Sequence, residues 1–555
     1  MRRQYAVRVY GCQPTYAVYS RSRDKNMKSP NTEDTASATN NMARQGSVVA
    51  SMTMLSRISG LARDVVLSYL FGASQIADMF FVAFRIPNFF RRLFAEGAFN
   101  QAFVPVLMQY KAAGQAQLLS FIASLSGLFA TALALFVCAG VLFAPALTAL
   151  FAPGFLDQPD VYQQTSELVR ITFPYLGLIS LTAYAAALLN AHGYFALPAV
   201  TPVLLNICLM LAAMVAIFGW VDAQPVVIVA WGVMVAGIVQ LLVQLPTLGR
   251  LGLLPRPNLN TKQEGVRQVG QLLLPAVFAA SVAQINALVN TILASTLVSG
   301  SIAWLYYADR LLELPVGLVA VALGTVILPH LSSMVARNDQ QRFNATLDWG
   351  LHLGLMLALP AAVALWLLAE PLVAVMFASF GGAMTAHDVV MAAAALEMFA
   401  LALPGFVLVK VLQPAFFANQ DTRTPFRYAV IAVAVNLVAS LATFSWMGHV
   451  GLALATALSA WTQALLLFYG LAAKGRYQMG GQLFVWSLRA LFCSMLLAVG
   501  LWYFSPPDTE WLTMLPLARV GWLALIVLAG LMGYAVALFL FGLRPHHLRN
   551  HGATL

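Results

Sequence analysis

The segment ISGLARDVVLSYLFGASQIADMFFVAFRIPNFFRRLFAEGAFNQAFVPV, residues 58–106, places seven charged residues within long apolar runs. Charged residues make up only 9% of the 555-residue chain, against about 25% in soluble domains, so this concentration needs an explanation. The seven are Arg63, Asp64, Asp78, Arg85, Arg91, Arg92 and Glu96. The environment of the whole chain has to be established before these charges can be interpreted.

Composition indicates that this environment is a lipid bilayer. Hydrophobic residues make up 60% of the chain, against roughly 45–50% in soluble domains. Apolar runs of about 20 residues or more, long enough to cross about 30 Å of hydrocarbon, recur from one end of the sequence to the other. We therefore predict an all-α polytopic membrane protein with about fourteen transmembrane helices. The predicted spans are 46–72, 76–108, 117–149, 165–190, 198–218, 226–248, 266–298, 302–334, 346–378, 388–419, 426–445, 450–473, 483–505 and 513–542.

The loops between these spans alternate in charge, which predicts their orientation. Cytoplasmic loops of membrane proteins collect Lys and Arg. One set of loops carries Lys111, Arg250, Arg256, Lys262, Arg267, Arg337, Arg342, Arg423, Arg427, Lys474, Arg476, Arg544 and Arg549. The intervening loops carry no Lys or Arg. We expect an even number of crossings with both termini in the cytoplasm, and the net charge of +10 then reflects topology and contact with anionic lipid rather than nucleic acid.

The first 45 residues have a different composition from the rest. They are rich in Ser, Thr, Asn, Arg and Lys and lack the apolar core of a signal peptide, which predicts a disordered cytoplasmic tail. Translation from Met42 is an alternative, because MARQGSVV leads almost directly into the first span. The four cysteines form no CxxC pair, so no metal site is expected from them.

Two segments of the sequence resemble each other, which predicts an internal repeat. They are FPYLGLISLTAYAAALLNAHGYFALPAVTPVLLNI, from residue 173, and LPGFVLVKVLQPAFFANQDTRTPFRYAVIAVAVNL, from residue 403. In both, a proline and an asparagine are separated by 32 positions. Repeats of this kind divide many transporters into halves around a central site. We predict two six-helix halves, 46–250 and 262–475, followed by two further helices at 483–543.

The charges within the spans have two interpretations. An ionised side chain at the bilayer centre costs at least about 2.5–3.5 kcal/mol, so such residues usually face protein or a water-filled cavity. Arg85, Arg91, Arg92 and Glu96 fit equally well as interfacial anchors, because long side chains reach the membrane surface. Three arginines lie well inside their spans and favour a functional site: Arg57, Arg63 and Arg310.

The positive charge that these arginines share predicts the kind of ligand. Several arginines in one cavity suit a polyanion such as a diphosphate, because guanidinium groups bind phosphate oxygens in pairs. We expect Asp64, Asp78 and Asp309 to orient the arginines and to limit their repulsion when the site is empty.

The segment Ser51–Val106, with SMTMLSRISGLARDVVLSYLFGAS and ADMFFVAFRIPNFFRRLFAEGAF, resembles the signature of the MurJ (MviN) family of bacterial lipid II flippases. Shorter matches are FAPGF at 151, WLYYADRLLELPVG at 304 and NQDTRTP at 419, and the resemblance extends from about residue 45 to the end. It implies a fold of the multidrug/oligosaccharidyl-lipid/polysaccharide exporter superfamily, in which two lobes enclose a central cationic cavity. It also implies that the substrate's lipid tail lies in a groove formed by residues 483–543.

The resemblance assigns roles to individual residues. Substrate-binding arginines fall on Arg57 and Arg63 in SRISGLARD, Arg91 in FFRRLFAEG and Arg310 in YYADR, and a functional acidic position falls on Asp78 in ADMFF. We add a set of supporting charges. These are Asp64, Arg92, Glu96 and Asp309.

The function implied by this resemblance is transport of lipid II, the undecaprenyl-diphosphate-linked disaccharide-pentapeptide needed for peptidoglycan synthesis. It would pass from the cytoplasmic to the periplasmic leaflet of the bacterial inner membrane by alternating access. We expect no cofactor, and lipid II and membrane lipids as partners, with the monomer as the functional unit. The identity of any coupling ion does not follow from the sequence.

Three alternatives remain open at this stage. The chain could flip another polyprenyl-diphosphate glycan, export drugs in exchange for cations, or act as a membrane glycosyltransferase on the same lipid. The excess of arginine disfavours cationic drugs. The segments predicted to face the periplasm are short and offer little room for a catalytic site, and the sequence has no GxxxxGK[ST] loop for ATP hydrolysis. We therefore predict a transporter and not an enzyme.

Overall fold

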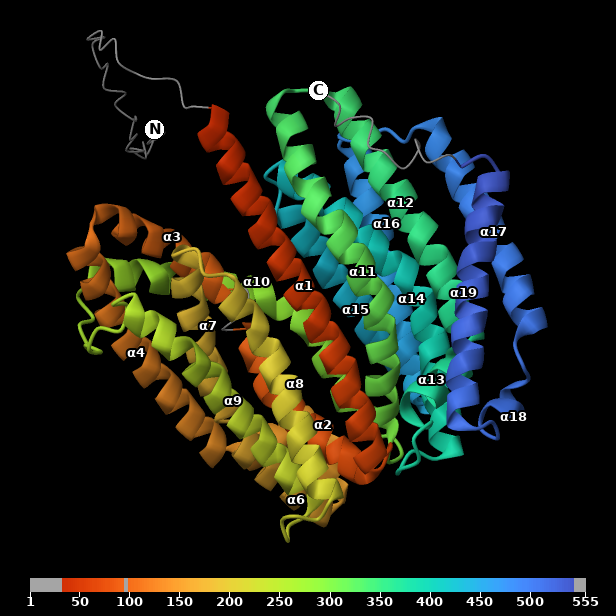
Figure 1. Cartoon of the computed structure of the whole chain (residues 1–555), viewed down its shortest axis with the longest axis horizontal. Helices are drawn as coiled ribbons and strands as arrows, with labels where there is room; N and C mark the ends of the chain where they lie inside the picture. Colours follow the sequence, from red (N-terminus) through yellow and green to blue (C-terminus); the bar gives the residue numbers. More distant parts are fainter. Residues whose placement is uncertain (1–31, 94–97, 544–555) are drawn as a thin grey trace, which may run out of the picture.

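The computed structural model describes residues 32–93 and 98–543 and contains helices but no strand in those two ranges (Figure 1). This confirms the predicted all-α class. The elements of the first part are α1 (Thr32–Phe71), α2 (Gln75–Arg91), α3 (Ala98–Ala113), α4 (Gln115–Leu142), α5 (Ala144–Phe151), the 3-10 helix η2 (Pro153–Asp157), α6 (Pro159–Thr172), α7 (Tyr175–Ala191), α8 (Ala196–Ile217), α9 (Pro225–Arg250) and α10 (Glu264–Ser295). Those of the second part are α11 (Ser301–Ala336), α12 (Gln340–Leu367), α13 (Ala369–Phe377), α14 (Ala386–Ala418), α15 (Arg423–Met447), α16 (His449–Ala473), α17 (Gly481–Phe504), α18 (Asp508–Trp511) and α19 (Pro516–Leu540).

Ten helical stretches in the described part of the chain have the length and apolar composition to cross a membrane. A multi-pass membrane protein is therefore confirmed. Four predicted spans, 46–72, 76–108, 266–298 and 302–334, are not among these ten, although their described residues are mainly helical. They correspond to α1, α2 with α3, α10 and α11, the helices that contribute most of the charged and amide side chains considered below.

Two predicted spans are interrupted by turns. The span 165–190 is divided between α6 and α7 at Phe173 and Pro174. The span 117–149 is divided between α4, which ends at Leu142, and α5, which begins at Ala144. Proline has no backbone N–H to continue a helical ladder, so Pro174 begins a new helix more readily than it extends the old one.

Residues 1–45 were predicted to form a disordered tail, but residues 32–45 are helical in the structure. Helix α1 begins at Thr32, well before the predicted start of the first span at residue 46. An apolar run cannot reveal this extension, because a helix outside the hydrocarbon no longer needs apolar side chains. The first 31 residues lie outside the described part of the chain.

The helices form two groups in Figure 1, with α1–α9 in red to yellow and α11–α19 in green to blue. Helix α1 packs mainly against α8, and also meets α11 and α13 of the second group. Helix α10 contacts both groups, since it packs against α3 and α15. The surfaces of α1, α2, α10 and α11 that face between the groups therefore enclose the site described below.

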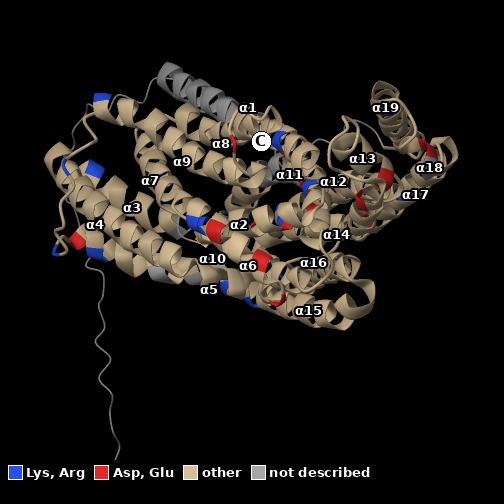
Figure 2. Cartoon of the chain, turned by 90° about the horizontal axis from the view of Figure 1, so that it is seen from below, with Lys and Arg blue, Asp and Glu red and all other residues tan. Residues whose placement is uncertain are grey.

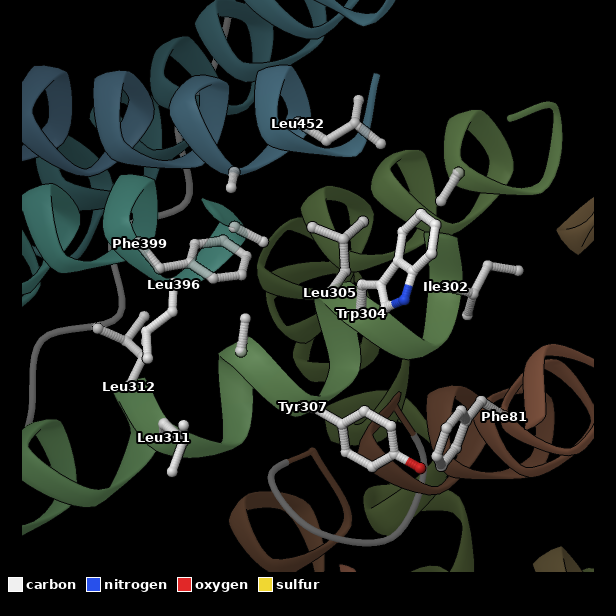
Figure 3. Packing of buried hydrophobic residues seen from close by; sticks show 14 of the residues in the cluster. Phe81, Ile302, Trp304, Leu305, Tyr307, Leu311, Leu312, Leu396, Phe399 and Leu452 are labelled. Atoms are coloured by element: carbon white, nitrogen blue, oxygen red, sulfur yellow. The ribbon is translucent and has the colours of Figure 1, made fainter. Parts of the chain in front are cut away.

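A buried aromatic cluster fixes α11 against its neighbours (Figure 3). Phe81 of α2 stacks on Tyr306 with ring centroids 4.0 Å apart and meets Tyr307 edge-on at 5.7 Å. The Trp304 indole N–H donates to the carboxylate of Asp388 at 3.0 Å, which satisfies the polar atom of this buried side chain. Packing on this side of α11 leaves its opposite side to project polar groups between the two helix groups.

The two groups meet closely at the end where the loops carry no Lys or Arg. A Cβ at Gly72, whose φ is +58°, would lie 2.3 Å from the Ala383 carbonyl oxygen, and a Cβ at Gly300 would lie 2.5 Å from that of Ala73. The backbone N–H of Ala383 also donates to the Tyr69 carbonyl at 3.0 Å. Only glycine permits such an approach of backbone to backbone. This end of the molecule is consequently sealed by main chain.

Candidate functional site

A buried carboxylate joins α1 to α11 at the centre of the molecule. Asp64 is fully buried and accepts from Nε and a terminal nitrogen of Arg63 at 2.9 and 2.6 Å. Its second oxygen lies 2.8 Å from Nε of Arg310 on α11. One carboxylate thus pairs with two guanidinium groups from different helix groups.

Two neutral side chains complete this cluster. The Tyr306 hydroxyl donates to Asp64 at 2.9 Å and accepts from Arg63 at 3.0 Å, while Asn206 of α8 accepts from Arg63 at 3.0 Å. The Arg310 guanidinium lies 5.1 Å from the centre of the Tyr306 ring, a distance typical of a cation–π contact. Each of the three guanidinium nitrogens of Arg63 therefore has at least one acceptor, which holds the side chain in this orientation.

Arg57, two helical turns before Asp64 on α1, contacts Glu313 of α11. Arg57 donates to the backbone carbonyl of Glu313 at 3.2 Å, and the Glu313 carboxylate accepts from Arg310 at 2.6 Å. The guanidinium of Arg57 fits against Gly317, where a Cβ would lie only 1.8 Å from it. A small residue on α11 thus creates the space that Arg57 occupies.

Helix α2 supplies further arginines, of which Arg85 donates to the Thr291 hydroxyl of α10 and Arg91 donates to the Asn88 side chain at 3.1 Å. Arg92, one residue beyond the end of α2, is exposed to the same space. Asp309 of α11 faces this space too and is the acidic residue nearest in sequence to Arg310. Figure 2 shows blue and red residues close together near α2 and α10, within a body that is mostly tan.

These side chains line three adjoining cavities. A cavity of about 200 Å³ contains Arg63, Arg85, Arg91, Arg92, Asp309, Arg310 and Glu313. A second of about 560 Å³ shares Arg63, Arg92 and Arg310 with it and adds Arg57, Asn206 and Lys410. A third of about 340 Å³ shares Arg85, Arg92 and Asp309 and extends between α10 and α16. Shared walls make the three compartments parts of one arginine-lined cavity.

The structure brings together most of the predicted site residues. Arg57, Arg63, Arg91 and Arg310 all line the arginine-lined cavity, as do the supporting residues Arg92 and Asp309, while Asp64 lies directly behind Arg63 and Arg310. Arg91 borders one of the three compartments and Arg92 borders all three. Glu96 lies outside the described residues.

Asp78 occupies a different place from the other predicted site residues. Its two carboxylate oxygens accept from the backbone N–H groups of Gly300 and Ala303 at 2.6 and 2.8 Å, where α11 begins. It borders none of the three compartments. A carboxylate at this position satisfies N–H groups that have no partner within the helix and complements the positive end of its dipole.

Several residues of the cavity were not predicted as site residues. They are Arg85, Asn206, Gln284, Asn286, Tyr306, Glu313, Lys410 and Gln463. The available signal was a polar side chain within an apolar span, which is costly in lipid unless it faces protein or water. Within residues 32–93 and 98–543, no three His, Cys, Asp or Glu side chains are grouped so as to hold a metal ion.

Comparison with known sequences identifies the relatives of this chain. Residues 67–520 match the family model described as lipid II flippase MurJ. A probable lipid II flippase MurJ from Vibrio cholerae is 41% identical over 523 residues, covering 92% of this chain and 98% of that protein. A lipid II flippase MurJ from Burkholderia cenocepacia is 38% identical over 520 residues, covering 92% of this chain and 99% of that protein.

Solved structures give the same result for the fold. A lipid II flippase MurJ in an inward closed conformation superposes with a TM-score of 0.75 at 25% identity, over 89% of this chain and 98% of that one. An inward-facing multidrug resistance MATE family transporter of the MOP superfamily superposes with a TM-score of 0.61 at 12% identity, over 77% of this chain and 97% of that one. The second likeness concerns the fold alone.

Proposed function

The chain belongs to the lipid II flippase MurJ family, and on this premise we propose that it flips lipid II across the bacterial inner membrane by holding the lipid's diphosphate in the arginine-lined cavity. The chain is a transporter and not an enzyme. The observation that supports the diphosphate site is the convergence of Arg63 and Arg310, from opposite helix groups, on the single carboxylate of Asp64.

Charge balance supports an anionic ligand. The cavity walls contain more cations than anions, since Asp309 and Glu313 and the adjacent Asp64 face a larger number of Lys and Arg side chains. Those cations are Arg57, Arg63, Arg85, Arg91, Arg92, Arg310 and Lys410. A diphosphate presents several oxygens that guanidinium groups bind in pairs, whereas a cationic drug would meet repulsion.

Asp64 acts as the counter-ion of the empty site. It neutralises the buried Arg63 and the half-buried Arg310 in the absence of substrate, so both guanidinium groups have a counter-ion without a bound anion. A diphosphate that reaches Arg310 from the cavity competes with Asp64 for this guanidinium. Binding therefore loosens the ion pair between α1 and α11 that holds the two helix groups together.

The transport cycle follows from this arrangement. In the proposed topology, with fourteen crossings and cytoplasmic termini, the backbone seal at Gly72 and Gly300 lies on the periplasmic side. The lobes are 46–250 and 262–475, and their rotation opens this seal after lipid II has entered from the cytoplasmic leaflet. Asp78 positions α11 across the seal and thereby links substrate binding at Arg310 to opening.

The lipid tail has a separate place on the second helix group. A groove of about 470 Å³ lies between α17 and α19 and is lined largely by apolar residues, among them Leu497, Leu525 and Gly533. An isoprenoid chain suits such a surface because both are apolar. Since the cavity and the groove belong to one chain, we assign the activity to the monomer, with no cofactor and no coupling ion of specified identity.

Complementation of a depleted strain tests the site. The variants Arg57→Ala, Arg63→Ala, Arg91→Ala and Arg310→Ala are compared at matched membrane expression, and the accessibility of lipid II at the periplasmic surface is measured. We expect lipid II to accumulate on the cytoplasmic side in all four. Arg250→Ala, in an exposed position at the end of α9, is the matched control and should flip normally. Normal flipping in all four cavity variants would refute the diphosphate site.

A further inference from the structure

We propose that the compartment between α10 and α16, next to the arginines, binds the sugar that is attached to the diphosphate of the substrate. This inference rests on the proposed function, because it assigns a second part of the same ligand. It concerns the cavity of about 340 Å³, near the lower end of the roughly 300–1,000 Å³ typical of small-molecule sites.

The position of this compartment suits a group covalently linked to the diphosphate. It shares Arg85, Arg92 and Asp309 with the compartment that contains Arg63 and Arg310. A ligand whose phosphates lie against Arg92 can therefore extend its next chemical group into the space between α10 and α16 without leaving the cavity.

The polar groups of this compartment are carboxamides and hydroxyls. Asn286 and Asn290 of α10 face Thr456 and Gln463 of α16 across it. Asn290 donates to the Thr456 hydroxyl at 3.0 Å, but its own carbonyl oxygen and that of Asn286 have no hydrogen-bond partner in the described part of the chain. Gln463 likewise makes no hydrogen bond within residues 32–93 and 98–543. Unpaired amides are costly away from bulk water, so a ligand that pairs with them gains affinity.

The chemistry of these amides selects a neutral polar ligand. A carboxamide offers two donors and a carbonyl acceptor, which match the hydroxyl and acetamido groups of a sugar. Its guanidinium groups are those of Arg85 and Arg92, which it shares with the compartment of the diphosphate site. Phe399 and Phe406 supply apolar walls for the C–H faces of a sugar ring. The compartment thus has the polar and apolar surfaces that an N-acetylated hexose needs.

Two lipids distinguish this assignment from the diphosphate site. Binding to the purified full-length protein is measured for undecaprenyl diphosphate and for undecaprenyl diphosphate that carries one N-acetylated sugar and no peptide. The test variant is Asn286→Leu combined with Gln463→Met, since both replacements nearly preserve side-chain volume while removing the hydrogen bonds. We expect it to bind the sugar-bearing lipid about tenfold more weakly and undecaprenyl diphosphate as well as the wild type does.

Retained binding of undecaprenyl diphosphate also shows that the variant is folded. Thr462→Val is the matched control on α16, because the Thr462 hydroxyl donates only to the Leu458 carbonyl of its own helix and Thr462 does not line the compartment. It should bind both lipids normally. An equal effect of the double variant on both lipids, or no effect on either, overturns the sugar site. If the wild type binds neither lipid, the diphosphate site itself is refuted and the sugar site with it.

Discussion

The cavity between α1 and α11 is lined by guanidinium, carboxylate and amide groups, whereas the groove between α17 and α19 is lined mainly by alkyl and aromatic side chains. In the cavity, Asp64 is buried only because two arginines and a tyrosine satisfy it. In the groove, the Tyr534 hydroxyl donates away from the hollow, to the Met356 carbonyl at 2.8 Å. The first region can compensate the charges of a headgroup, and the second offers a tail only apolar contact.

Substitutions in the cavity and in the groove should therefore have different effects on stability and transport. A change in the cavity breaks a charge network that holds the two helix groups together, so it should alter both stability and transport. A change in the groove alters only a surface that the lipid tail occupies, so it should alter transport and leave the fold intact. The predictions below test this difference in order of expected effect.

The largest effect is expected for Asp64→Ala. Removal of the carboxylate leaves Arg63 buried without its charged partner and Arg310 without its contact to α1, and breaking a buried pair in this way costs about 3–5 kcal/mol. We expect a lowered melting temperature of the purified protein and loss of lipid II flipping in cells. Asp157→Asn, at an exposed position in η2, is the control and should retain both properties. If the melting temperature of the Asp64 variant is unchanged, the charge network does not stabilise the fold and this difference between cavity and groove is refuted.

A smaller effect is expected for Gly533→Leu in the groove. A Cβ at Gly533 meets no atom within 4 Å, so the new side chain enters open space between α17 and α19 and displaces part of the tail. Displacing about two methylene groups corresponds to roughly tenfold weaker binding of a long-chain lipid. The melting temperature should not fall, because leucine favours helix over glycine.

Gly521→Leu is the matched control for the groove. Gly521 also lies on α19 and its Cβ would meet no atom within 4 Å, but it does not line the groove. Binding of a long-chain undecaprenyl lipid should be weakened by the Gly533 variant alone, and binding of a short-chain analogue with the same headgroup by neither. Equal weakening with the short-chain analogue would show that the groove does not act on the tail.

Gly317→Ala probes the cavity without removing a charge. The added methyl group would lie 1.8 Å from the Arg57 guanidinium, which must move and give up its bond to the Glu313 carbonyl. Because Arg57 is long and can adopt another rotamer, we expect only about a threefold decrease in flipping rate. Gly270→Ala, on α10 with no atom within 4 Å of its Cβ, should have no effect. A variant as inactive as Arg57→Ala would mean that the exact position of this guanidinium is decisive.

The comparison of cavity and groove shows what the sequence could predict. Composition predicted helices in a membrane, and charge within apolar spans identified Arg57, Arg63 and Arg310, because lipid penalises charge wherever it occurs. The same penalty is weaker for amides and hydroxyls, so Asn206, Asn286 and Tyr306 were not identified. A separation of six residues puts Arg57 and Arg63 well apart around an ideal helix, yet both line the cavity, since a long side chain can fold along its helix to reach Asp64.

Asp78 illustrates a second limit of the sequence. It lies seven positions before Arg85, and residues seven apart lie nearly in line on a helix. Its carboxylate nevertheless accepts from the start of α11, which is distant in sequence, and does not border the cavity. A helical pattern predicts the direction in which a side chain projects from its own helix, but it does not predict which residue that side chain contacts. The partner depends on the packing of α2 against α11, which no single segment specifies.

The smallest effect is expected in the loops that follow α14 and α16, away from both regions. Asp421 pairs with Lys474 and Arg476 at 2.7 and 3.0 Å in the loops that follow α14 and α16. Burial acts to raise the pKa of Asp421, but hydrogen bonds from Lys474 and Thr424 outweigh it, so the pKa lies below its usual range. The stabilisation is therefore present at neutral pH and is lost only in strong acid, as the pH falls through this lowered pKa.

Because the cationic partners are partly exposed, Asp421→Asn should lower the free energy of unfolding by at most about 1 kcal/mol at pH 7. The difference from the wild type should shrink at high salt, and lipid II flipping should be unchanged. Asp222→Asn, at an exposed position between α8 and α9, is the control and should show no salt-dependent difference. Asp421 lines neither the cavity nor the groove. If the Asp421 variant loses flipping at normal stability, charged residues outside the cavity are also needed for transport.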